Sequence, residues 1–175
     1  MKFTAYEIAI SALSCALATV LLTVGTYVPL LLFTGYLFGS VALMMPLCKG
    51  SYKGFVIAYL ATVILTLVFN GFNFFDVLPF AVFFGLHPLV NELQLKTKIN
   101  VWLACFLKAL WFDGAMYLTW WLVFEATTSI PFVDQYFLPI LLIVGTAFFV
   151  FYDSTMYRCR GVVNKTMERL HKKGR

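Results

Sequence analysis

The chain has 175 residues, of which 62% are hydrophobic and only 12% are charged, and its formal net charge is +5. Its mean hydropathy of +0.88 lies far above that of soluble globular domains. This composition leaves no room for a separate soluble domain, and we expect no nucleic-acid partner. Since an apolar run of roughly 20 residues crosses a bilayer as a helix, we expect an all-α, multi-pass membrane protein with six transmembrane helices.

Helix-breaking and charged residues divide the chain into six apolar segments. Their expected boundaries are 4–24, 30–47, 55–69, 77–90, 101–124 and 137–157. The fourth segment is short and contains Pro79, Gly85 and Pro88, so we expect it to be tilted, broken or partly re-entrant. Residues 1–157 are thus predicted to form a single transmembrane domain, followed by a basic cytoplasmic tail over residues 158–175.

The basic residues indicate how these helices are oriented. Twelve of the 13 Lys and Arg residues precede the first segment, follow the sixth, or lie in the connections after the second and the fourth: Lys2, Lys49, Lys53, Lys96, Lys98, Arg158, Arg160, Lys165, Arg169, Lys172, Lys173 and Arg175. The positive-inside rule places these connections and both termini in the cytoplasm. The exception is Lys108, within the fifth segment.

The basic tail also carries apolar residues at helical spacing. Met156, Val163, Met167 and Leu170 are separated by 7, 4 and 3 residues. This spacing predicts that the sixth helix continues along or away from the cytoplasmic surface, where its cations attract anionic membrane lipids.

Small residues recur along one face of the first segment. They are Ala5, Ala9, Ala12, Ala16, Thr19 and Thr23, separated by 4, 3, 4, 3 and 4 residues. At about 100° per residue they form a narrow stripe, and small side chains let a second helix approach closely. The stripe either packs the first helix against its own bundle or docks another subunit. In the docking interpretation the contact is made by Ala5, Ala9, Ala12 and Ala16.

The sequence ALSCA at residues 12–16 resembles the AxxxA motif in helix one of the S components of energy-coupling factor (ECF) vitamin transporters. The chain is also similar to these proteins in its length, its basic charge and its six-helix layout with both termini inside. The resemblance implies a bundle of the S-component kind, in the cell membrane of a bacterium. It implies a substrate-capturing subunit of an importer for a small vitamin-like or other micronutrient solute. The implied partners are ATPase subunits and a transmembrane coupling subunit, which would contact Ala12 and Ala16.

Several polar side chains fall in the cytoplasmic half of the predicted bundle. Lys108 lies roughly 12 Å from the start of its helix, and an unpaired charge inside a bilayer costs several kcal/mol. We therefore expect a buried polar network drawn from Glu7, His87, Lys108 and Asp153, in which Asp153 or Glu7 is the partner of Lys108. Such a network either holds helices together or couples protons or movement to transport.

Asp113 lies near the middle of the membrane and begins a second polar surface. It follows Lys108 by five residues, so the two side chains point about 140° apart and are poor partners for each other. Asp113, Tyr117 and Trp120 share one face of the fifth helix. The expected substrate-binding residues are Tyr27, Asn70, Asn73, Asp76, Asp113, Tyr117, Trp120 and Gln135. Acids, amides and aromatic rings suit a pocket that stacks a flat ring and hydrogen-bonds its edge, although Trp and Tyr also form belts at membrane interfaces.

Other functional classes find little support. The chain has no HExxH, GxSxG or phosphate-binding glycine loop, so we expect no enzyme activity, cofactor or metal site. Its four cysteines form no CxxC pair, and we expect free thiols. The alternative function is a ligand-free membrane scaffold similar to the rod-shape-determining membrane proteins. The divergent faces of Lys108 and Asp113 argue against a small channel or proton-coupled carrier.

Overall fold

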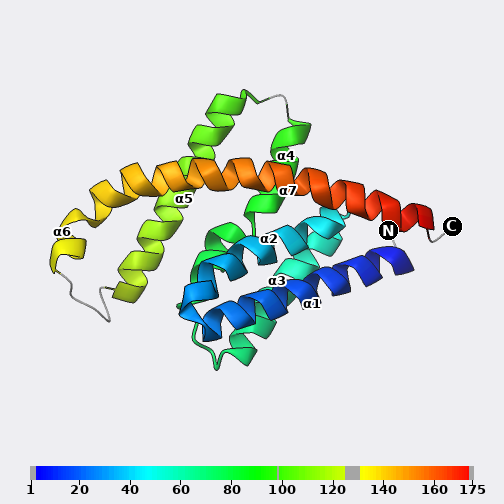
Figure 1. The fold of residues 1–175 in the computed structure, drawn as a ribbon, viewed down its shortest axis with the longest axis horizontal. Coiled ribbons are helices and arrows are strands. Elements are labelled where there is room, and N and C mark those ends of the chain that lie inside the picture. The colour runs from blue at the N-terminus through cyan, green and yellow to red at the C-terminus, as the bar shows by residue number, and fades with distance from the viewer. Residues whose placement is uncertain (1–2, 98, 125–130, 174–175) are drawn as a thin grey trace.

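A computed structural model of the chain describes residues 3–97, 99–124 and 131–173, and every regular element in these ranges is helical (Figure 1). The α-helices are α1 (Ala5–Tyr27), α2 (Leu32–Leu47), α3 (Tyr52–Phe69), α4 (His87–Lys96), α5 (Val101–Phe124), α6 (Pro131–Ile140) and α7 (Thr146–Lys173). Short 3-10 or π-helical turns are η1 (Pro29–Leu31), η2 (Phe80–Phe84) and η3 (Leu141–Gly145). The expected all-α class is confirmed for the described residues.

Within the described residues, five helical segments are long and apolar enough to cross a membrane. They are Ala5–Tyr27, Pro29–Leu47, Tyr52–Phe69, Val101–Leu122 and Gln135–Arg169. They correspond to the first, second, third, fifth and sixth segments expected from the sequence. At about 1.5 Å per residue, the last of them is longer than the roughly 30 Å hydrocarbon core of a bilayer. Its C-terminal part therefore extends past the membrane-spanning length, as the spacing of apolar residues in the tail predicts.

The fourth expected segment is a broken helix. Instead of one helix over residues 77–90, a π-helical turn η2 follows Pro79, and α4 begins at His87 with Pro88 in its first turn. Proline has no backbone N–H and cannot continue a regular helical ladder. Each of the two short elements therefore begins next to a proline, with the break between them just before Pro88, and α4 continues to Lys96, six residues beyond the expected end.

Two basic side chains contact aromatic rings of other segments, near the N-terminus and at the start of α3. Lys49, in the α2–α3 turn, has its Nζ 5.9 Å from the ring centroid of Tyr6 near the N-terminus. Lys96, at the end of α4, has its Nζ 4.5 Å from the ring of Tyr52. Figure 1 shows the start of α1 and the end of α7 on the same side of the molecule. The placement of these segments on the cytoplasmic side stays a prediction of the positive-inside rule, and Lys2, Lys98 and Arg175 lie outside the described residues.

Glycines permit close packing of α1 on α2. A Cβ added at Gly35 would lie 2.9 Å from the backbone oxygen of Leu21 and 3.4 Å from the Cα of Gly25. The same interface contains a buried hydrogen bond, from Ser14 Oγ to the Ala42 carbonyl at 2.7 Å. In a membrane, where lipid is as apolar as the side chains, such close van der Waals contact is a main source of helix association.

Aromatic side chains pack η2 against α5 and α7. Phe83 in η2 lies 5.0 Å from Phe112 in α5 and 6.0 Å from Phe149 in α7, measured between ring centroids. All three side chains are buried. Edge-on and tilted aromatic pairs contribute beyond the area they bury. This aromatic core places η2 between α5 and α7 and positions α4 beside both helices.

Candidate functional site

A buried ionic cluster connects α4, α5 and α7. Lys108 on α5 is only 4% exposed, and its Nζ lies 2.7 and 2.8 Å from the two carboxylate oxygens of Asp153 on α7. It also donates to Oδ1 of Asn91 on α4, at 2.9 Å. His87, fully buried on α4, has its Nε2 3.0 Å from Asp153 Oδ1, near enough for an ion pair but without hydrogen-bond geometry.

The cluster extends toward the end of α4. The hydroxyl of Tyr157 lies 3.4 Å from Lys108 Nζ and donates to Gln94 Oε1 at 2.6 Å. One further pair joins the same two helices, since Arg160 on α7 lies 2.6 Å from Glu92 on α4. Asp153, Tyr157 and Arg160 are spaced 4 and 3 apart, so one face of α7 supplies all three contacts.

The protein itself satisfies the donors of the lysine. An ammonium has three N–H donors and no acceptor, and Lys108 has Asp153, Asn91 and Tyr157 as partners. The charges of Lys108 and Asp153 also balance, which is what allows both to be buried. The geometry therefore favours a structural role, in which the cluster holds three helices together, over a solute-binding site with an unoccupied hydrogen-bonding position.

Glu7 lies apart from this cluster, contrary to our expectation. Its carboxylate accepts hydrogen bonds from the backbone N–H and the hydroxyl of Thr4, each at 2.9 Å. The Thr4 hydroxyl in turn accepts from the Glu7 backbone N–H, which completes a capping box at the start of α1. A carboxylate at this position satisfies the first backbone donors of the helix, so Glu7 needs no lysine partner.

Four of the expected substrate-binding residues gather at the α3–η2 connection. Tyr27 donates from its hydroxyl to the Phe69 carbonyl at 2.6 Å. Asn70 Nδ2 donates to the Asn73 carbonyl at 2.7 Å, and Asn73 Nδ2 donates to Asp76 Oδ2 at 2.8 Å. Partial burial raises the pKa of Asp76 above its usual value. These bonds fold the connection onto itself and tie it to the end of α1.

A second group of expected residues lies along α5. Thr146 at the start of α7 donates to Asp113 Oδ2 at 3.1 Å, while the buried Asp113 Oδ1 has no hydrogen-bond partner in the described part of the chain. Trp120 stacks on Phe137 of α6, with ring centroids 4.4 Å apart, and its buried Nε1 also has no partner there. Tyr117 is exposed, with its ring 5.9 Å from that of Trp120.

The remaining expected residue, Gln135, is an exposed residue of α6. The eight expected substrate residues thus fall into a connection group held by its own hydrogen bonds and an α5 group. Among the described residues, one carboxylate oxygen and one indole N–H of the α5 group have no partner, and neither has Asn70 Oδ1 of the connection group. Buried polar atoms without partners are costly, so Asp113, Trp120 and Asn70 are the candidates for ligand contact.

The small-residue stripe on α1 is exposed over its first four members. Ala5, Ala9, Ala12 and Ala16 are all exposed, whereas Thr19 is buried within the bundle. The described part of the chain therefore leaves the alanine face uncovered and packs the opposite face of α1. The sequence alone could not separate these two uses of the stripe.

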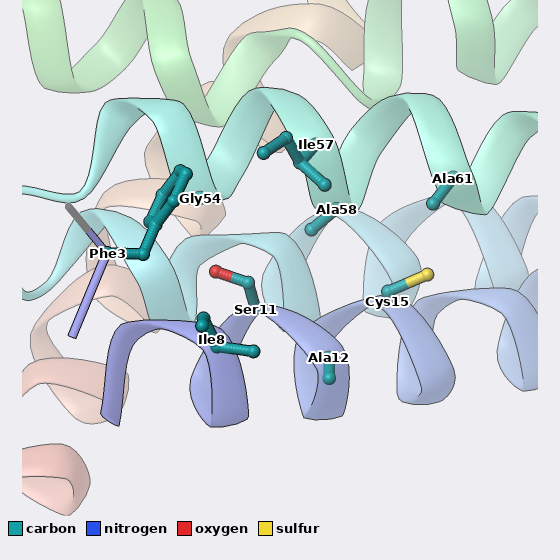
Figure 2. Close-up of a pocket in the computed structure, with 9 residues that line it drawn as sticks. All are labelled: Phe3, Ile8, Ser11, Ala12, Cys15, Gly54, Ile57, Ala58 and Ala61. Atoms are coloured by element: carbon teal, nitrogen blue, oxygen red, sulfur yellow. The ribbon is translucent and has the colours of Figure 1, made fainter. Parts of the chain in front are cut away.

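Beside the alanine face lies an apolar groove of about 300 Å³ between α1 and α3. Figure 2 shows Ser11 and Cys15 rising from α1 toward α3, where Gly54, Ala58 and Ala61 lie. Small side chains form most of this wall. A Cβ at Gly54 would come within 2.4 Å of Ser11 Oγ, so a larger residue at this position would displace the Ser11 side chain.

Comparisons with protein-family models, with curated proteins and with solved structures found no match. Among the described residues, no group of three or more His, Cys, Asp or Glu side chains could hold a metal ion. The functional assignment therefore depends on the geometry of this chain.

Sequence reasoning missed several members of the ionic cluster. Asn91 and Gln94 follow His87 by four and seven residues, and Tyr157 follows Asp153 by four. Residues at these spacings share a helix face, so the periodicity could have found them. Thr146, the partner of Asp113, stands within an apolar run and carries no comparable signal.

Proposed function

We propose that this protein is the substrate-capturing membrane subunit of an ECF-type importer, working with a separate transmembrane coupling subunit and ATPase subunits. The observation that carries the proposal is the exposed alanine face of α1, formed by Ala5, Ala9, Ala12 and Ala16. Helices pack closely in lipid where small residues line the contact. A face of this kind, left uncovered by the bundle itself, suits docking of a helix from another subunit.

The proposed solute contacts are on α5. Asp113 Oδ1 offers an acceptor and Trp120 Nε1 offers a donor, since neither has a partner among the described residues, and the Trp120–Phe137 stack offers an aromatic surface. Together these groups favour a small solute with a flat ring and a hydrogen-bonding edge. The carboxylate favours a neutral or cationic solute over an anionic one.

The docking proposal is tested by co-purification. Tagged protein is co-expressed with ECF coupling and ATPase subunits, and the retained subunits are quantified. Ala12→Trp and Ala16→Trp are expected to reduce retention strongly, because an indole keeps the partner helix from approaching. Leu103→Trp, at a residue of α5 that is 53% exposed, is the matched control and should retain the complex. If the unmodified protein retains no ECF subunit, the proposal is wrong.

The substrate site is tested separately by mass spectrometry of small molecules retained by the purified protein. Asp113→Asn should lower the retained amount while leaving the folded yield unchanged, since Thr146 is its only hydrogen-bonding partner among the described residues. If the yield of folded protein falls and the bound solute per folded molecule does not, Asp113 has a structural role instead.

A ligand-free scaffold is the second candidate. It is favoured by the position of two apolar grooves in the described part of the chain, which are lined mainly by residues of α1, α2, α3 and α7 and not by the α5 group. A scaffold would retain no solute from any growth medium and would co-purify with cell-wall machinery in place of ATPase subunits.

A further inference from the structure

A second apolar groove, of about 480 Å³, lies between α1, α2 and the C-terminal part of α7. Its floor is formed by large side chains such as Leu13, Leu17 and Phe38, which are 54%, 44% and 50% exposed. Val162 and Met167 approach from α7. Figure 1 shows the C-terminal end of α7 running beside the start of α1.

The groove is as long as an acyl chain requires. Along α1 it extends from Tyr6 to Leu21, which is about 22 Å at 1.5 Å per residue. One leaflet accounts for about 15 Å of the hydrocarbon core. An apolar groove open to the lipid and running through the depth of a leaflet is filled by hydrocarbon, because leaving its walls without contacts forfeits their dispersion energy.

Cations lie along one edge of the α7 wall of this groove. Arg158, Val162, Lys165 and Arg169 are spaced 4, 3 and 4 apart on α7, so the three cations lie along the same edge as Val162, which is 64% exposed. All three cations are exposed. Glu168, the acid of this part of α7, lies about 120° from Val162 around the helix and therefore on another face.

A fourth cation comes from the α2–α3 turn. Lys49 is exposed and lies 5.9 Å from the ring of Tyr6, which lines the groove. Arg160 is different, since its charge is balanced by Glu92 at 2.6 Å. The rim of the groove thus combines an excess of positive charge with an apolar channel beneath it.

We propose that this groove binds one anionic phospholipid, with an acyl chain along α1 and α2 and the phosphate beside Lys165, Arg169 and Lys49. Both parts of the site are needed. The apolar channel accepts any phospholipid chain, and the cations select an anionic headgroup over a zwitterionic one. The bound lipid fills the space between α1 and the end of α7 and attaches that helical extension to the membrane.

The test is native mass spectrometry of the full-length protein in detergent. Phosphatidylglycerol and phosphatidylcholine with identical chains are supplied in equal amounts, and the ratio of the two singly bound species is measured. We expect phosphatidylglycerol to dominate. Lys165→Gln with Arg169→Gln should lower the ratio about tenfold, whereas Lys53→Gln with Lys96→Gln, which removes the same charge elsewhere, should change it less than about twofold.

A second pair of variants tests the channel. Leu17→Trp places a large ring in the groove and should abolish the first bound phosphatidylglycerol. Leu107→Trp makes the same change at a residue of α5 that is 53% exposed and should retain it. Equal loss of the lipid ratio in both charge variants would overturn the proposal, because it would show only diffuse attraction to the basic end. Unchanged lipid binding in Leu17→Trp would also overturn it.

Discussion

Replacing Lys108 by methionine should destabilise the protein by stranding the carboxylate of Asp153. In the native structure that carboxylate has the lysine ammonium at 2.7 and 2.8 Å. After the substitution, its closest charge-compensating group is His87 Nε2 at 3.0 Å, and the ring must take up a proton in a fully buried position to act as a cation. Methionine restores the packing of the lysine stem and removes only the charge.

The expected size follows from the burial of the pair. Lys108 and Asp153 are 4% and 7% exposed, and removing one member of a buried ion pair costs about 3–5 kcal/mol. The Asn91 and Tyr157 contacts of Lys108 are also lost, each worth roughly 0.6 kcal/mol as an interhelical hydrogen bond in a membrane. We therefore expect Lys108→Met to lower the free energy of unfolding by about 5 kcal/mol.

Adding Asp153→Asn to Lys108→Met should restore about 2 kcal/mol, because the stranded charge is removed along with its partner. The assay is unfolding in mixed detergent–SDS micelles, applied to the unmodified protein, both single variants and the double variant. The control is Lys96→Met, the same substitution at an exposed lysine over the Tyr52 ring, which should cost less than about 1 kcal/mol. If the two single effects simply add in the double variant, the pair does not hold these helices together and the reasoning is wrong.

Two further predictions concern packing and reactivity. Gly35→Ala should destabilise the α1–α2 contact by about 1–3 kcal/mol in the same unfolding assay, because its Cβ would meet backbone atoms. Gly114→Ala, in α5 with no atom within 4 Å of the added Cβ, should stabilise by up to about 1 kcal/mol; equal effects would contradict the packing argument. Burial raises the pKa of the Cys48 thiol from 9.0 to about 11, so alkylation by iodoacetamide at pH 8 should be slow and should increase toward pH 11. Peptide mass spectrometry measures this rate, and half-maximal reactivity near pH 9 would contradict it.

The ionic cluster shows how far sequence reasoning reaches. A lysine deep in an apolar segment must find an anion, and few anions are available, so the pairing of Lys108 with Asp153 could be predicted. Glu7 could also be assigned from its sequence context, since Thr4 precedes it by three residues in the pattern of a capping box. The capping box is recognised from residues close together in the sequence, whereas the network was inferred only from the depth of each residue in the membrane. For Glu7, the local sequence pattern gave the correct partner.

The expected substrate residues show where such reasoning fails. Asn70, Asn73 and Asp76 are polar and lie between apolar segments, as residues of a binding loop would. The conformation of the connection instead uses most of their polar atoms for hydrogen bonds to one another, and leaves Asn70 Oδ1 without a partner among the described residues. Asp113 has a hydrogen bond from Thr146 to one oxygen, while its other oxygen has no partner in the same part of the chain. Polarity identifies both groups, but only the geometry shows which atoms are already bonded.

By itself, the sequence determined the class of the protein and the positions of its long helices, because an apolar run in lipid must satisfy its backbone hydrogen bonds internally. It also indicated that residues 77–90 could not form a regular helix, since prolines remove backbone donors. Only the tertiary structure decided which faces of the helices are covered. Ala12 and Thr19 belong to one stripe in the sequence, yet the first is exposed and the second is buried. That difference depends on where α2 and α3 pack against α1, and such contacts between distant segments are not encoded in the periodicity of one helix.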